Sequence, residues 1–109
     1  MEVKAISKDT GLSPRKVRLL VDMVRGKKVS EALNMLQFTP TPKAKYIAKL
    51  VRSAAANAEN NFQMDPAGLK IVRIFADDAP SMRRYRARSR GRASHIKKRS
   101  SHITVIVAD

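Results

Sequence analysis

Apolar residues recur at helical spacing in three stretches of the chain. In the first stretch, four of them follow one another at i, i+3, i+4 and i+7: Val17, Leu20, Val21 and Val24. Ser13 and Pro14 precede this run, and Gly26 follows it. A serine as N-cap, a proline in the first turn and a glycine after the last apolar position are typical of a helix. The pattern predicts a helix over about residues 13–25.

Two further helices are expected around the Thr-Pro-Thr-Pro segment at residues 39–42. A short one can begin with Ser30 as N-cap and must end before this segment, because a residue preceding proline disfavours helical geometry. A long one can begin with Thr41 as N-cap and Pro42 in its first turn, and it runs for about 21 residues. Its continuous apolar face consists of Ile47, Leu50, Val51, Ala54, Ala55, Ala58 and Phe62.

Three segments have the alternation or the β-branched composition of strands. EVKAISKD at the start of the chain alternates weakly, whereas LKIVRIFA (69–76) and HITVIVA (102–108) are strong strand candidates. The two strong candidates flank a basic segment, which indicates an antiparallel pair with its turn near residues 88–90. This register places Val72 opposite Ile106, Ile74 opposite Thr104 and Arg83 opposite His95.

The basic segment between these strands carries most of the charge. The 109 residues have a formal net charge of +14 and a pI near 11.0. Arg83–Arg99 contains seven arginines, two lysines and no acid, a charge of +9, which leaves +5 for the rest of the chain. Few hydrophobic residues interrupt it, so the segment is expected to project as an arm. With both strands extended, about nine residues at about 3.3 Å each give a reach of about 30 Å.

The composition of this arm favours a polyanionic partner. Arginine forms forked hydrogen bonds with phosphate and stacks on bases, and Tyr85 adds a further stacking surface. A disordered basic tail would have the same composition, but the strand that follows the arm favours an ordered arm. Two further basic groups lie on the predicted helices. The far side of the first carries Arg15, Lys16, Arg18 and Arg25. The third carries a stripe of Lys45, Lys49 and Arg52, which could equally be a solvated helix face or a contact surface.

Several kinds of catalytic and metal site are excluded or disfavoured. The chain has no cysteine, and its four glycines stand alone, so neither thiol chemistry nor a phosphate-cradling loop is available. Asp77 and Asp78 face opposite sides of a strand and are expected to be exposed or paired with an arginine. His95 and His102 also point to opposite faces of one strand. We therefore expect no enzyme, metal or cofactor. The chain lacks a long apolar run or a signal peptide, so we expect a soluble intracellular protein.

Three stretches of the sequence resemble a known family closely and in order: SPRKVRLLVDMVRGKK (13–28), AAANAENN (54–61) and RGRASHIKKRSSHITVIV (90–107). They resemble the large-subunit ribosomal protein that the bacterial scheme numbers twenty-two. The resemblance implies an α+β fold with three helices packed on a small antiparallel sheet and a long protruding β-hairpin. It implies one RNA-binding domain over residues 1–109, with residues 82–99 as the hairpin arm.

The resemblance also implies partners and a location. The protein would be a cytoplasmic component of the large ribosomal subunit, a monomer within the ribosome, in contact with large-subunit ribosomal RNA, other large-subunit proteins and the nascent peptide, with no membrane. It would support subunit assembly, and its arm would line the peptide exit tunnel with Met82, Arg83 and Arg84. The residues expected to bind RNA are Arg15, Lys16, Arg18, Lys45, Lys49, Arg52, Arg83, Arg84, Arg86, Arg88, Arg90, Arg92, Lys97, Lys98 and Arg99.

Two other classes of protein would fit the charge. An architectural DNA-binding protein could use a basic arm in a groove, but such proteins usually dimerise, and the sequence shows no self-complementary apolar patch. A membrane-active cationic peptide needs an amphipathic helix, whereas the arm alternates arginines with few apolar residues. Composition alone does not distinguish RNA from DNA. The choice of RNA rests on the resemblance.

Overall fold

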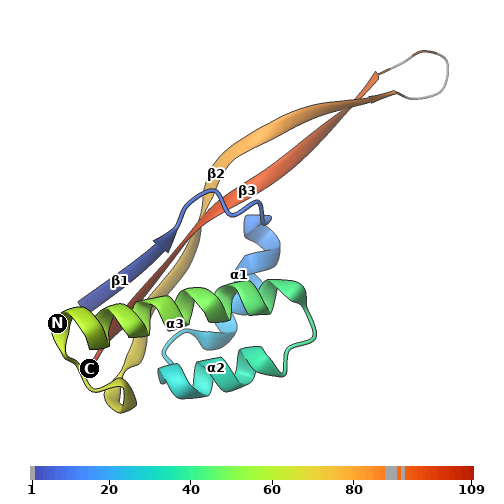
Figure 1. Ribbon diagram of the computed structural model, residues 1–109. Helices are drawn as coiled ribbons and strands as arrows, with labels where there is room; N and C mark the ends of the chain where they lie inside the picture. The colour runs from blue at the N-terminus through green and yellow to red at the C-terminus, as the bar shows by residue number, and fades with distance from the viewer. Residues whose placement is uncertain (1, 88–90, 92) are drawn as a thin grey trace.

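The fold is a layer of helices against a small sheet, from which two strands extend outwards (Figure 1). The computed structural model describes residues 2–87, 91 and 93–109, and it describes side chains for residues 2–81, 91 and 98–109. The elements follow in the order β1 Glu2–Ser7, α1 Pro14–Val24, α2 Val29–Gln37, α3 Pro42–Phe62, the 3-10 turn Pro66–Gly68, β2 Lys70–Ala87 and β3 Ala93–Ala108. The fold is therefore α+β, as expected.

The helices lie where the apolar spacing predicts them, but their first turns differ from expectation. Ser13 and Thr41 occupy the N-cap positions of α1 and α3, yet neither side chain makes a capping hydrogen bond. The prediction of Ser30 as the N-cap of α2 is wrong, because the N-cap is Lys28, two residues earlier, and the helix begins at Val29. Val29 is 6% exposed, and its N–H donates to the carbonyl of Leu69 at 3.1 Å, so contact with the residue just before β2 sets the start of this helix.

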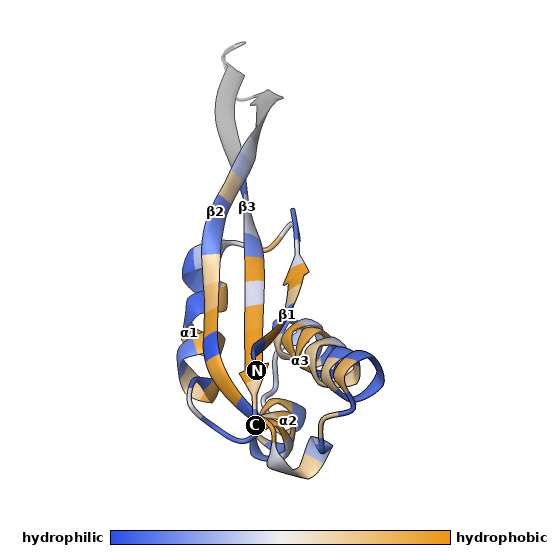
Figure 2. Cartoon of the chain, turned by 90° about the vertical axis from the view of Figure 1, so that its left-hand side faces the viewer, coloured by the Kyte–Doolittle hydropathy of each residue, from blue (hydrophilic) through white to orange (hydrophobic). Residues whose placement is uncertain are grey.

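The three strands form one antiparallel sheet in the order β1-β3-β2. Residues along each strand alternate between the face that packs on the helices and the open face, as the period of a strand requires. Figure 2 shows the apolar side of the helices turned toward the sheet. The inward-facing residues are Val3 and Ala5 on β1, Ile71, Ile74 and Ala76 on β2, and Ile103, Val105 and Val107 on β3.

The register of β2 and β3 differs from the predicted one beyond the first pairs. Lys70 and Ile71 pair with Ala108 and Val107, but the register shifts between Ile71 and Arg73 and again between Ala79 and Met82. Each shift is a bulge that adds one residue to β2, first at Val72 and then at Pro80 and Ser81. The predicted pairs are therefore wrong: Ile106 lies opposite Arg73, Ile74 opposite Val105 and Arg83 opposite Lys97.

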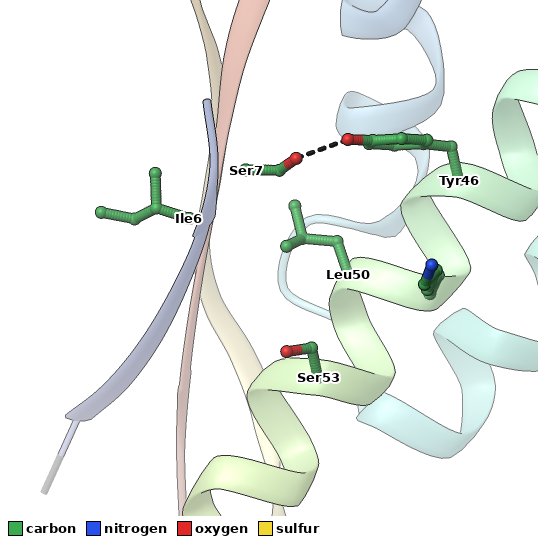
Figure 3. Close-up of a pocket in the computed structure, with 6 residues that line it drawn as sticks. Ile6, Ser7, Tyr46, Leu50 and Ser53 are labelled. Carbon is green, nitrogen blue, oxygen red and sulfur yellow. Dashed lines mark hydrogen bonds between the residues drawn. The ribbon is translucent and has the colours of Figure 1, made fainter. Parts of the chain in front are cut away.

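The core lies between the inner face of the sheet and the three helices. Alanines on α3 are part of it, among them Ala44, Ala54 and Ala58 at 0% exposure, and their small side chains let this helix approach β1 closely. At the edge of this contact, the hydroxyls of Ser7 and Tyr46 hydrogen-bond to each other (Figure 3). The core residues that the structure describes all come from the ranges 3–76 and 103–107.

Strand pairing continues beyond this core. It runs outwards to Ala87 opposite Ala93, past the last core residue of β2 at Ala76 and of β3 at Ile103. The protein measures 62 × 26 × 18 Å along its principal axes, so it is more than twice as long as it is wide. Residues 83–87 of β2 and 93–99 of β3 thus form the outer part of a hairpin (Figure 1).

Candidate nucleic-acid interface

The predicted arm residues fall on both strands of the hairpin. Met82, Arg83, Arg84 and Arg86 belong to β2 and lie opposite residues 94–98 of β3, so basic positions face one another across the ribbon at Arg83 and Lys97. Lys98 and Arg99 are exposed. Arg88, Arg90 and Arg92 lie outside the described residues. Like charges at directly opposite positions are unfavourable for strand pairing.

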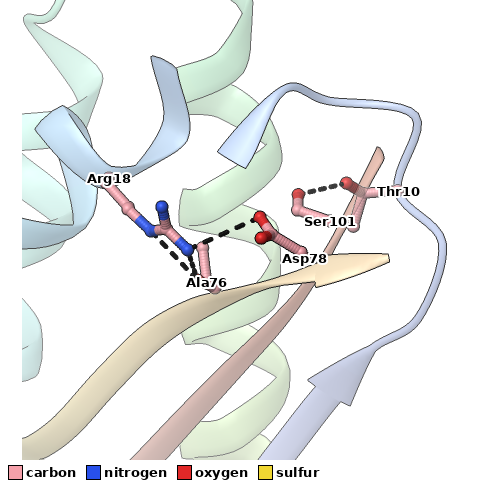
Figure 4. A network of polar contacts seen from close by, with 5 residues as sticks. All are labelled: Thr10, Arg18, Ala76, Asp78 and Ser101. Atoms are coloured by element: carbon pink, nitrogen blue, oxygen red, sulfur yellow. Dashed lines mark hydrogen bonds and ion pairs between the residues drawn. The ribbon is translucent and has the colours of Figure 1, made fainter. Parts of the chain in front are cut away.

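On α1 the three predicted residues differ in their surroundings. Arg15 and Lys16 are exposed. Arg18 is exposed as well, but it donates from Nε and Nη2 to the carbonyl oxygen of Ala76 on β2, at 3.2 and 3.1 Å. Its Nη2 also lies 3.6 Å from the carboxylate of Asp78 (Figure 4). Arg18 therefore has a structural contact that its position on a basic helix face does not reveal.

A second arginine, at the C-cap of α1, repeats this contact seven residues later. Arg25 donates from Nη2 to the carbonyl oxygen of Ile74 at 2.9 Å and from Nη1 to Asp22 at 2.7 Å. Gly26 and Lys27, which follow the helix, form backbone hydrogen bonds with Ile71 of β2 at 3.1 and 2.9 Å. The outer edge of β2 is thus covered by α1 and the residues that follow it, which protects it from pairing with another strand.

The predicted stripe on α3 is exposed. Lys45, Lys49 and Arg52 are each solvent-accessible, and the structure gives their side chains no hydrogen bond or ion pair with any residue that it describes. Lys45 borders a shallow hollow beside residues 39–42, and Lys49 borders a groove between α3 and β1. These cations are free to meet an external anion, whereas those of Arg18 and Arg25 are partly engaged.

The root of the arm is held by the loop between β1 and α1. The N–H of Thr10 donates to Ser101 O at 3.0 Å, and the N–H of Gly11 donates to Ser100 Oγ at 2.9 Å. Ser100 Oγ in turn donates to Asp9 Oδ1 at 2.8 Å, and Thr10 and Ser101 join their hydroxyls (Figure 4). Ser100 and Ser101 are buried at 7% and 0% exposure. These bonds fix β3 to the body at the point where the hairpin leaves it, a contact between residues about 90 apart that sequence reasoning missed.

The acidic and histidine residues form no catalytic or metal site in the described part of the chain. Asp78 lies beside Arg18, and Asp77 is exposed, which agrees with the expectation for this pair. His102 Nδ1 accepts a hydrogen bond from the N–H of Asp9 at 2.9 Å. Among residues 2–81 and 98–109, no three His, Asp or Glu side chains gather where they could hold a metal ion. No helix in the described residues is long and apolar enough to span a membrane.

Comparison with known proteins identifies the class to which this fold and basic surface belong. The family model described as ribosomal protein L22p/L17e matches residues 5–108. A protein of Dehalococcoides mccartyi strain 195 named large ribosomal subunit protein uL22 is 67% identical over 109 residues, the full length of both chains. The protein of the same name from Desulforamulus reducens is 53% identical over 109 residues, all of this chain and 96% of its own.

The chain belongs to the ribosomal protein L22p/L17e family. It is accordingly a structural constituent of the large ribosomal subunit and not an enzyme. The resemblance found in the sequence is confirmed over nearly the whole chain.

Proposed function

We propose that the chain binds large-subunit ribosomal RNA through its arm and through the exposed cations of α1 and α3, and that this binding supports subunit assembly. The observation that carries the proposal is strand pairing that continues to Ala87 and Ala93, well beyond the core, along six of the nine basic residues of a segment with no acid. A two-stranded ribbon of this charge is poorly stable alone and gains its stability from phosphate contacts.

The division of labour among the cations follows from their surroundings. Arg15 and Lys16 on α1 and the stripe of Lys45, Lys49 and Arg52 on α3 are exposed and take part in RNA contact. Arg18 acts mainly by fixing α1 to β2, because two of its three guanidinium nitrogens bond to Ala76 O. The remaining RNA contacts come from the arm: Arg83, Arg84, Arg86, Arg88, Arg90, Arg92, Lys97, Lys98 and Arg99.

We assign the tunnel-lining role to Met82, Arg83 and Arg84, and with it contact with the nascent peptide. These residues begin the arm on its outgoing strand, just beyond the bulge at Pro80 and Ser81. In this proposal residues 1–109 act as one RNA-binding domain and as a monomer, and residues 82–99 are the arm. The bonds between the β1–α1 loop and Ser100–Ser101 set the direction of the arm, because they join its returning strand to the body.

Sedimentation of a cell lysate tests the proposal. The full chain should migrate with large ribosomal subunits, whereas a chain with residues 83–99 replaced by a two-residue Asn-Gly turn should be depleted from them. Equal incorporation of the two chains would contradict the assignment of the arm to assembly. Migration of the full chain with DNA, or as a free protein, would contradict RNA binding in the subunit.

A further inference from the structure

The two edges of the sheet are not equivalent. The outer edge of β2 is covered by the protein's own residues, since Ile71, Ile74 and Ala76 all hydrogen-bond to α1 or to the residues just after it. No hydrogen bond in the described residues covers the outer edge of β1 in this way between Glu2 and Ile6. The edge of β1 is therefore the open edge of this sheet.

The pairing pattern identifies which residues face that open edge. In an antiparallel sheet, the N–H and C=O of one residue point to the same side. Ile71, Ile74 and Ala76 point their backbone N–H and C=O groups away from β3. Their partners on β3 must then point their own N–H and C=O groups toward β1. The resulting hydrogen-bonded pairs between β3 and β1 are Val107 with Val3, Val105 with Ala5 and Ile103 with Ser7. The N–H and C=O groups of Glu2, Lys4 and Ile6 must then point outwards.

A groove lies beside the last of these three outward-facing residues, Ile6. It has a volume of 230 Å³ and is lined by Ile6 and Ser7 of β1 and by four residues of α3: Tyr46, Lys49, Leu50 and Ser53. Figure 3 shows the side chain of Ile6 on the opposite side of β1 from α3. It is consequently the backbone of Ile6, with its unpaired donor and acceptor, that borders the groove.

We propose that this groove receives an extended peptide segment of another large-subunit protein, which adds to β1 as a fourth strand. The added strand pairs with the N–H and C=O of Lys4 and Ile6, the mode of recognition in which main-chain hydrogen bonds give affinity and a pocket gives specificity. One of its side chains packs between β1 and α3 against Leu50, and an acidic side chain reaches Lys49.

The chemistry of the edge favours a peptide over RNA. A strand offers donors and acceptors in alternation, so it satisfies both the N–H and the C=O of Lys4 and Ile6. An RNA backbone offers charged acceptors at its phosphates, which would repel the two carbonyl oxygens, and its 2′-hydroxyl donors do not form the continuous alternating ladder that a strand provides. A second copy of this chain is disfavoured as well, because pairing of β1 with β1 brings Lys4 and Lys8 of both copies together.

Site-specific crosslinking in large subunits tests the proposal. Ser53, exposed at the rim of the groove, is replaced by the photo-crosslinker p-benzoylphenylalanine in the full chain, and irradiated subunits are digested and mapped. We expect a crosslink to a segment of another protein that contains an acidic residue. Ile6→Pro should lower its yield about tenfold, the factor expected for one lost ladder hydrogen bond and its steric cost. Ile6→Val keeps the N–H and should leave the yield unchanged.

Proline is tolerated at this position because the N–H of Ile6 points away from β3. Crosslinks to RNA alone, no crosslink to protein, or equal yields from Ile6→Pro and Ile6→Val would overturn the proposal. If Ile6→Pro subunits do not form, hydrogen exchange of the unsubstituted chain decides. The amides of Lys4 and Ile6 should exchange faster than those of Ala5 and Ser7 in the free protein and become protected in the subunit, and unchanged fast exchange would overturn the proposal.

The proposal rests on membership of the large subunit and not on the RNA contacts of the arm. RNA binding by the free chain is measured through its salt dependence, which the groove does not affect. The two proposals can therefore fail separately.

Discussion

Replacing Arg18 by glutamine should destabilise the protein while changing its electrostatic contact with RNA only slightly. The side chain of Arg18 bonds twice to the carbonyl oxygen of Ala76 on the outer edge of β2 and approaches Asp78. Glutamine loses the Nη2 bond and the positive charge, and it can keep at most a neutral version of the Nε bond, because its Nε2 occupies the same place along the side chain. The matched control is Arg15→Gln on the same helix, which removes an identical charge from an exposed side chain.

The expected loss follows from the kind of bond and its exposure. A hydrogen bond to a charged donor contributes about 1.5–3 kcal/mol, and the side chain of Arg18 is 51% exposed, so solvent lowers this value. The ion pair adds little, because the side chain of Asp78 is 81% exposed. We expect Arg18→Gln to cost about 1–2 kcal/mol, which lowers Tm by roughly 5–10 °C in a chain of this size.

Two measurements separate the structural role of Arg18 from a role in RNA contact. Thermal unfolding followed by circular dichroism should show the lower Tm for Arg18→Gln and an unchanged Tm for Arg15→Gln. The log–log salt slope of RNA binding should fall by about 0.7–0.9 for Arg15→Gln and by much less for Arg18→Gln. An Arg18→Gln protein with the original Tm, or with the larger loss of slope, would refute the reasoning.

Three further predictions concern the arm. A chain with residues 83–99 replaced by an Asn-Gly turn should still melt cooperatively, because the described core residues all lie outside this range, and loss of cooperative melting by circular dichroism would refute the separation of core and arm. The double substitution Arg90→Gln, Arg92→Gln should reduce the salt slope by about 1–2 units if both side chains contact phosphate, and an unchanged slope would mean that they face open space. Replacing residues 82–84 by serine keeps the strand parity, and it should leave subunits assembled while altering drug binding in the tunnel. The control chain carries Arg88→Ser, Arg90→Ser and Arg92→Ser, and an equal loss of assembly in both chains would contradict the prediction.

The sequence predicts the elements of this fold well because their signals are local. Apolar spacing and the proline at Pro42 place α3 over Pro42–Phe62, the full length expected. The pairing of β2 with β3 also follows from two matched β-branched runs around a basic segment. The register fails after Ile71, because a bulge at Val72 depends on how β2 meets α1 and leaves no signal in the alternation itself.

The candidate site is predictable in its charge but not in the partners of each cation. Arg15 and Arg18 look alike on a helical wheel and both are exposed, yet only Arg18 bonds to Ala76 O. The hydrogen bonds between Thr10 and Ser101 join residues far apart in sequence, and only the fold brings them together. The open edge of β1 likewise depends on strand order and on what covers β2, neither of which a single sequence states.

The salt dependence of binding to a large-subunit RNA fragment tests the central claim most directly, because the slope counts phosphate contacts. The full chain is compared with the chain that lacks residues 83–99, which carry nine basic residues. If about half of these cations contact phosphate, the slope should become shallower by roughly 3–4 units on removal of the arm. Equal slopes for the two chains would contradict the account, since they would mean that the arm makes no phosphate contact.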